Sequence, residues 1–66
     1  MKIFINTEPK ELNGTKNVFE LVEHLGISTK GMALAVNNSI VPKADWEKHE
    51  LKENDKVTII RATQGG

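Results

Sequence analysis

The fold of this chain is decided by residues 17–26, which read NVFELVEHLG. Apolar residues recur there at i, i+3, i+4 and i+7, a spacing that places them on one side of a helix. They are Val18, Leu21, Val22 and Leu25. Asn17 and Glu20 have the spacing of an N-terminal capping pair, and Gly26 suits the left-handed position that ends a helix. The stretch therefore predicts one amphipathic helix from Val18 to Leu25.

A hairpin is predicted before this helix. Residues 1–6 read MKIFIN, in which every second side chain is a large aliphatic one, the period of a strand with one face on a core. Residues 7–9, with Pro9 as their last member, are expected to form the turn. Residues 10–12 can then return as a short second strand.

Three further strands are predicted after the helix, over residues 32–36, 40–41 and 57–62. Asn37-Asn38 tolerates the positive φ values of a tight hairpin turn between the first two of them. A single helical turn is expected at residues 44–47 and another tight turn at residues 53–55. Trp46, the only indole, is expected to cover one end of the core.

The order strand, strand, helix, strand, strand, strand predicts an α+β fold of the β-grasp, or ubiquitin-like, type. We expect a mixed sheet of four to five strands with the helix packed on one face, because hairpins are antiparallel while the helix acts as a crossover. The first and last strands would then lie side by side and parallel at the centre. Residues 1–62 are expected to form this domain, and residues 63–66 a flexible tail.

Composition excludes several classes of function. The chain has 66 residues, enough for one small domain with one thin core. Nine basic residues balance nine acidic ones without a basic, aromatic-rich cluster, so no nucleic-acid partner is expected. Cysteine is absent, which excludes disulfides and thiolate metal sites. No stretch approaches the roughly 20 apolar residues that span a membrane, and we expect a cytoplasmic protein without a membrane partner.

The polar residues do not predict a catalytic centre. His24 and His49 are far apart in the sequence and are expected on the solvated surface, with no metal site. The acidic residues, Asp55 among them, are scattered and are interpreted as a solvating surface rather than a paired acid and base. We therefore expect that the chain is not an enzyme.

The chain ends in Gly65-Gly66, and this end predicts a function. Glycine lacks a Cβ, so a diglycine tail is thin enough to enter a narrow active-site channel of a partner protein. The Gly66 carboxylate is ionised at neutral pH and can attack the α-phosphate of a nucleotide to form an acyl-adenylate. Gly66 is thus the predicted site of modification, and Gly65 is predicted to help the tail thread into the partner.

A partner interface is predicted beside the tail. If the aliphatic residues of the first and last strands face the helix, Phe4 and Ile60 must point to the opposite side of the sheet, which has no second layer. Ala35 and Ala62 are expected to border this pair. The four residues are predicted to form a surface that an adenylating enzyme could contact.

The chain as a whole resembles the ubiquitin-like sulfur carriers, and among them the ThiS family. The resemblance rests on the start MKIFIN, on Ala35-Val36-Asn37, on residues 40–43 with Trp46, on the turn between Leu51 and Val57, and on the diglycine end. The family usually has Gly-Asp where this chain has Asn54-Asp55, and asparagine also accepts left-handed backbone angles.

The resemblance implies a sulfur carrier for thiamine thiazole biosynthesis. A ThiF-type adenylyltransferase would activate Gly66 with ATP, and a sulfur donor enzyme would supply the sulfur of a C-terminal thiocarboxylate. Thiazole synthase (ThiG) would consume that sulfur. The chain itself would bind no cofactor, because the ATP belongs to the partner, and it is expected to be a monomer when free.

Three alternatives stay open on the sequence. The chain could be the small subunit of a molybdopterin synthase, although such chains tend to be longer and lack the Val-Pro and Trp segment. It could be a ubiquitin-like modifier that is joined through Gly66 to lysines of other proteins. It could also be an interaction domain whose diglycine end is inert.

Overall fold

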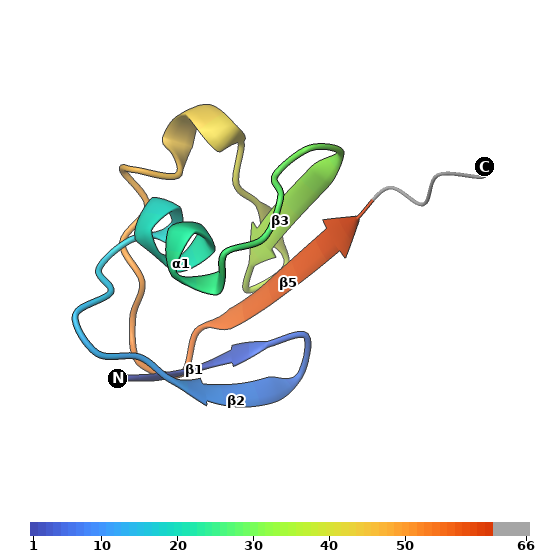
Figure 1. Cartoon of the computed structure of the whole chain (residues 1–66). Helices are drawn as coiled ribbons and strands as arrows, with labels where there is room; N and C mark the ends of the chain where they lie inside the picture. The colour runs from blue at the N-terminus through green and yellow to red at the C-terminus, as the bar shows by residue number, and fades with distance from the viewer. Residues whose placement is uncertain (62–66) are drawn as a thin grey trace.

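The part of the chain that the structure describes forms five strands and one α-helix, in the order that the sequence predicts. A computed structural model of the chain describes residues 1–61. The elements are β1 (Lys2–Ile5), β2 (Glu8–Glu11), α1 (Val18–Leu25), β3 (Met32–Val36), β4 (Ser39–Ile40), a short 3₁₀ helix η1 (Lys43–Asp45) and β5 (Lys56–Arg61) (Figure 1).

The five strands form one mixed sheet in the order β2-β1-β5-β3-β4. β1 and β5 are parallel, with Phe4 opposite Lys56 and Ile5 opposite Val57, and the other neighbouring strands are antiparallel. The parallel pair at the centre is the arrangement predicted for a β-grasp fold, and it is confirmed.

The core lies between this sheet and α1, which covers one of its faces (Figure 1). The largest side chains that are fully buried come from three strands and the helix: Ile3, Leu34, Val57, Val18 and Leu21. Alternate residues of each strand contribute to this core because successive side chains of a strand point to opposite faces.

Both predicted ends of α1 are confirmed. The Asn17 side chain accepts a hydrogen bond from the Glu20 amide at 2.8 Å, while the Glu20 carboxylate accepts one from the Lys16 amide at 2.8 Å. Gly26 ends the helix with φ 66°, and its N–H donates to carbonyls of the last turn. The helix is therefore capped at both ends by the residues that the pattern indicates.

The first hairpin differs from the prediction. Its turn is Asn6-Thr7, with φ values of 50° and 72°, rather than residues 7–9. Strand β2 begins at Glu8 and includes Pro9, which lies opposite Phe4. The proline is tolerated because β2 is an edge strand, where a missing N–H need not interrupt the ladder.

Smaller differences concern the second half of the chain. β4 comprises Ser39–Ile40 instead of residues 40–41, and the helical turn comprises Lys43–Asp45 instead of residues 44–47. β5 begins one residue earlier than predicted, at Lys56, and Ala62 lies outside the described residues. The prediction that Trp46 covers part of the core is confirmed, because its side chain is 3% exposed and its Nε1–H donates to the Val41 carbonyl at 2.9 Å.

Asp55 is not part of a solvating surface, contrary to our interpretation of the acidic residues. Its side chain is buried, and it accepts hydrogen bonds from Asn37 Nδ2 at 3.0 Å and from the Lys52 amide at 2.8 Å. The sequence did not indicate this role because Asp55 joins two turns that are 18 residues apart. Of the two histidines, His24 is exposed and His49 is half-buried.

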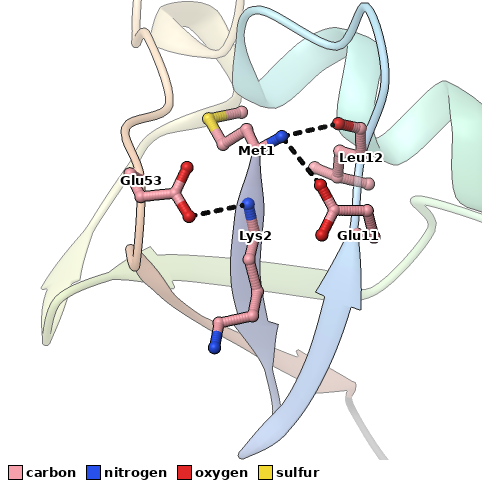
Figure 2. A network of polar contacts seen from close by, with 5 residues as sticks. All are labelled: Met1, Lys2, Glu11, Leu12 and Glu53. Carbon is pink, nitrogen blue, oxygen red and sulfur yellow. Dashed lines mark hydrogen bonds and ion pairs between the residues drawn. The ribbon is translucent and has the colours of Figure 1, made fainter.

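The start of β1 is fixed by contacts on both of its sides (Figure 2). The α-ammonium of Met1 donates to Glu11 Oε2 at 2.9 Å and to the Leu12 carbonyl at 3.1 Å. The Lys2 amide donates to Glu53 Oε2 at 3.1 Å. These bonds join the first residues to β2 and to the turn that precedes β5.

No helix within residues 1–61 is long and apolar enough to cross a membrane.

Candidate functional site

The candidate site is the surface around β5, the strand that leads to the end of the chain. β5 lies between β1 and β3, and its pairing with β3 extends to the pair Met32 and Arg61. The root of the C-terminal segment is thus anchored at the centre of the sheet. Three predicted residues lie outside the described residues: Gly66, the predicted site of modification, Gly65, predicted to help the tail thread into the partner, and Ala62, a predicted interface residue.

The two faces of β5 differ as predicted. Val57 is 1% exposed and belongs to the core, and Ile59 packs against the core from the same face. Ile60 lies on the opposite face and is 49% exposed. The face of the sheet away from α1, which we call the open face, therefore carries an exposed isoleucine at the root of the chain end.

Phe4 shares the open face with Ile60, because Ile3 and Ile5 on either side of it are buried in the core. The Phe4 side chain is half-buried, and Lys2 Nζ lies 5.4 Å from the centroid of its ring. That distance lies within the range of a cation–π contact. The aromatic ring of the predicted interface is thus held beside a cation.

Ala35 also lies on the open face, but little of it is accessible. The register places it between Thr58 of β5 and Ile40 of β4, and its side chain is 6% exposed. Ala35 therefore forms part of the floor of the surface, while Phe4 and Ile60 are the accessible predicted residues.

Sequence reasoning missed Ile40, the most exposed large apolar side chain described on this protein, at 61%. It lies opposite Ala35 and therefore on the open face. The signal was present in the sequence: a two-residue turn at Asn37-Asn38 fixes the register, and that register pairs Ile40 with Ala35. The open face is accordingly wider than the predicted patch and extends to the β4 edge.

Basic side chains flank these apolar residues. Lys56 is the register partner of Phe4 and lies with Lys2 on the open face. A shallow hollow beside them is lined by residues of β1, β5 and the two hairpin turns: Phe4, Thr7, Asn38, Lys56, Val57 and Thr58. Within residues 1–61, no three His, Cys, Asp or Glu side chains lie close enough together to hold a metal ion. The arrangement presents apolar and basic groups beside the chain end.

The family model described as the ThiS family matches residues 3–66. The chain belongs to the ThiS family. It is 32% identical over 66 residues to the sulfur carrier protein ThiS of Escherichia coli, with 100% of both chains covered. It is 30% identical over 64 residues to the sulfur carrier protein ThiS of Thermus thermophilus, an alignment that covers 97% of this chain and 98% of that one.

Two further comparisons bear on the fold and on partners of this ThiS-family chain. The crystal structure of the thiamine biosynthesis protein ThiS from Geobacter metallireducens superposes with a TM-score of 0.85 at 22% identity, over 100% of both chains. The fold is therefore that of ThiS proteins.

A thiazole synthase of Paramagnetospirillum magneticum is 30% identical over 66 residues, which cover 100% of this chain and 20% of that protein. A segment similar to this chain thus occurs within a longer protein named thiazole synthase.

Proposed function

We propose that this protein is the sulfur carrier of thiamine thiazole biosynthesis, and that it is a substrate of enzymes rather than a catalyst. The observation that carries the proposal is the full-length similarity to curated sulfur carriers, with 32% identity over 66 residues of both chains. In the sequence, the diglycine end follows β5, the central strand of the sheet, after three intervening residues. A rigid root and a slender end suit a chain that must deliver its terminus to other active sites.

The chemistry takes place at the Gly66 carboxylate. An oxygen of this carboxylate attacks the α-phosphorus of ATP in the active site of a ThiF-type adenylyltransferase, and pyrophosphate leaves. A sulfur nucleophile delivered by the sulfur donor enzyme then attacks the acyl carbon, and AMP leaves. With a persulfide donor, the product is an acyl disulfide between Gly66 and the donor; a second thiol attacks the donor sulfur, forms a disulfide with it and releases the thiocarboxylate, whereas sulfide gives the thiocarboxylate directly. No cofactor of this chain takes part in these steps.

The open face is proposed as the surface that the adenylyltransferase recognises. Phe4, Ile60 and Ile40 offer exposed or half-exposed apolar area, and Lys2 and Lys56 add positive charge. A partner surface with apolar side chains at its centre and carboxylates at its rim would complement this arrangement. Ala62 is included in the proposal as a residue next to the strand end, with Ala35 as part of the floor.

Thiazole synthase is proposed as the enzyme that consumes the thiocarboxylate. Support comes from the longer relative named thiazole synthase, in which a segment similar to the whole of this chain makes up 20% of the protein. Two activities joined in one polypeptide commonly act on a shared intermediate. We place the cycle in the cytoplasm, where ATP for the activation step is available, and propose a monomeric free carrier.

Intact mass spectrometry tests the proposal directly. The protein is incubated with ATP, a ThiF-type adenylyltransferase and sulfide, and its mass is measured with and without each component. We expect a mass gain equal to the replacement of one oxygen by sulfur, located at Gly66 by fragmentation. A variant that lacks Gly65 and Gly66 serves as the control, because its domain retains β5 and should fold but should gain no sulfur.

The same preparation separates the alternative functions. A folded protein that gives neither adenylate nor thiocarboxylate with an active enzyme would contradict the carrier function. Conjugates of higher mass, joined through Gly66 to lysines of other proteins, would instead favour a ubiquitin-like modifier. Rescue of a thiamine auxotroph by the full chain and not by the truncated one would exclude an inert diglycine end.

A further inference from the structure

The hydrogen bonds of β5 alternate between its two neighbours. The Asn37 amide donates to the Lys56 carbonyl at 2.7 Å, so the even-numbered residues of β5 direct their backbone polar groups toward β3. The Asn6 amide donates to the Val57 carbonyl at 2.9 Å, so the odd-numbered residues direct theirs toward β1. Thus Val57, Ile59 and Arg61 depend on the β1 side for their backbone partners.

The ladder between β1 and β5 ends on a side chain. In a parallel ladder, one residue donates its N–H to one carbonyl of the neighbouring strand and accepts from the amide two residues further on. Asn6 donates to Val57 in this way, but its φ of 50° belongs to the hairpin turn and redirects its own carbonyl. Its side-chain Oδ1 accepts from the Ile59 amide at 2.9 Å instead. The Asn6 side chain therefore supplies the last acceptor of the β1–β5 ladder, and the ladder ends at this residue.

The next position of this ladder consists of the Ile59 carbonyl and the Arg61 N–H. β1 has already turned toward β2 at Asn6-Thr7, so no strand of the described chain runs beside these two groups (Figure 1). Arg61, Asn6 and Thr7 are all exposed, and Ile59 is partly exposed. An acceptor and a donor thus stand at an accessible strand edge, in the geometry that a further parallel strand would use.

We propose that this edge of β5 pairs with an extended segment of the adenylating enzyme when the enzyme takes up the chain end. One residue of that segment donates its N–H to the Ile59 carbonyl and accepts from the Arg61 N–H, in the place that β1 would occupy if it continued. This is recognition by strand addition, in which main-chain groups supply the hydrogen bonds.

The adenylating enzyme is the occupant that the arrangement favours. The edge is continuous with Ile60 of the open face, and residues 59–61 are the last described residues before the terminus that the enzyme must reach. Gly66 follows Arg61 by five residues, which span at most roughly 18 Å of extended chain, so a protein that encloses Gly66 comes within that reach of this edge. The inference rests on the proposed function, because it assumes that the terminus is the substrate of an adenylating partner.

A proline at position 61 tests the pairing. Arg61→Pro removes the N–H that faces the edge, and it leaves the β3 ladder intact because Met32 and Arg61 form a pair that exchanges no backbone hydrogen bonds. The matched control, Arg61→Ala, removes the same guanidinium but keeps the N–H. We expect Arg61→Pro to bind the adenylyltransferase about five- to tenfold more weakly than Arg61→Ala, a loss of the size that one net hydrogen bond contributes.

Amide hydrogen exchange of the wild-type protein provides a second measurement that does not depend on the variant. The Arg61 amide should exchange rapidly in the free carrier and become protected in the complex. The Thr58 amide, which faces β3, should be protected in both states and serves as the internal reference. An Arg61 amide that stays unprotected in the complex, or equal affinity of the two variants, would overturn the proposal.

Two other outcomes are distinguishable. Protection of Arg61 in the carrier alone, rising with concentration together with a dimeric mass, would assign the edge to a second copy and also overturn the proposal. Failure of the wild-type protein to form an adenylate with an active enzyme would instead contradict the proposed function. Normal adenylate formation by the wild type with no protection at Arg61 leaves the function standing and refutes only the strand pairing.

Discussion

Asn6 and Asn37 stand on opposite sides of β5 and make the same contact with it. Each lies at the first position of a two-residue turn with positive φ, 50° and 51° respectively. Each donates its amide to a β5 carbonyl, and each accepts a β5 amide through its side-chain Oδ1, from Ile59 at 2.9 Å and from Lys56 at 3.0 Å. Two side chains thus replace the carbonyls that the turns redirect, and they fix the central strand from both sides.

The two asparagines should respond differently to the substitution Asn→Asp. Asn6 uses an acceptor oxygen, which aspartate also provides, so Asn6→Asp should change the free energy of unfolding by less than about 0.5 kcal/mol. Asn37 also donates from Nδ2 to the buried Asp55 carboxylate at 3.0 Å. Asn37→Asp would replace this donor by an acceptor that faces a carboxylate, with an expected loss of about 1–3 kcal/mol.

Urea unfolding of both variants measures this difference, and each serves as the control of the other. Asn37→Ser carries no charge and does not place a second carboxylate against Asp55. It should therefore be less destabilising than Asn37→Asp. Equal stability of Asn6→Asp and Asn37→Asp would show that the contact with Asp55 contributes nothing.

These asparagines also show what sequence can and cannot predict in this fold. The helix, the central parallel strands and the orientation of Phe4 and Ile60 follow from periodicity, because one buried face fixes the register of each strand. The roles of Asn6 and Asp55 were missed because they join segments that are distant in sequence, 53 residues apart for Asn6 and Ile59. The sequence pattern predicts a turn at Pro9, because the tolerance of proline in β2 depends on the strand being at the sheet edge, which is a property of the whole sheet.

A matched pair of substitutions, each at a phenylalanine, should show that the adenylyltransferase binds the open face and not the helix side. Phe4→Asp places a charge on the proposed interface, whereas Phe19→Asp places the same charge on α1, where Phe19 is 38% exposed. We expect Phe4→Asp to weaken binding to a ThiF-type adenylyltransferase at least about tenfold, equivalent to about 1.4 kcal/mol, as truncation of a central interface residue does. Calorimetric titration measures both affinities, and circular dichroism verifies that both variants are folded. Equal affinity of Phe4→Asp and the wild type would exclude Phe4 from the interface.

Stability should fall at alkaline pH because of the Met1 ammonium. Its hydrogen bond to Glu11 raises the pKa of this group above the usual 8.0, and the charges of Glu11 and Glu53 act in the same direction, against a smaller lowering by desolvation. A group with a raised pKa in the folded state contributes stability below pH 8.0 that is lost as the pH rises through the raised value.

The measurement is the free energy of unfolding between neutral and alkaline pH, compared between the wild type and Glu11→Gln. Because other groups titrate in both proteins, the difference between the two curves isolates the ammonium. The wild type should lose its advantage over Glu11→Gln as the pH rises, and a difference that is independent of pH would contradict the assignment. The effect is expected to be small, since the ammonium is well solvated.

Asn54 has a left-handed backbone conformation, and its contacts show what this conformation does for the fold. It adopts φ 70° in the turn before β5, and its amide donates to the Lys2 carbonyl at 2.7 Å. Asparagine accepts this left-handed conformation better than other residues with a Cβ, but glycine adopts it at no steric cost. Asn54→Gly should therefore preserve or slightly increase stability, although glycine also adds flexibility to the unfolded chain. Asn54→Ala should decrease it by about 1 kcal/mol, because alanine has the steric conflict without a polar side chain that compensates.

Thermal unfolding of the three proteins measures this order. We expect the Tm of Asn54→Gly to be equal to or above that of the wild type, and the Tm of Asn54→Ala to be below it. If alanine were as stable as asparagine, the turn would have to adopt another conformation, and the hydrogen bond to Lys2 that places β5 beside β1 would be lost with it.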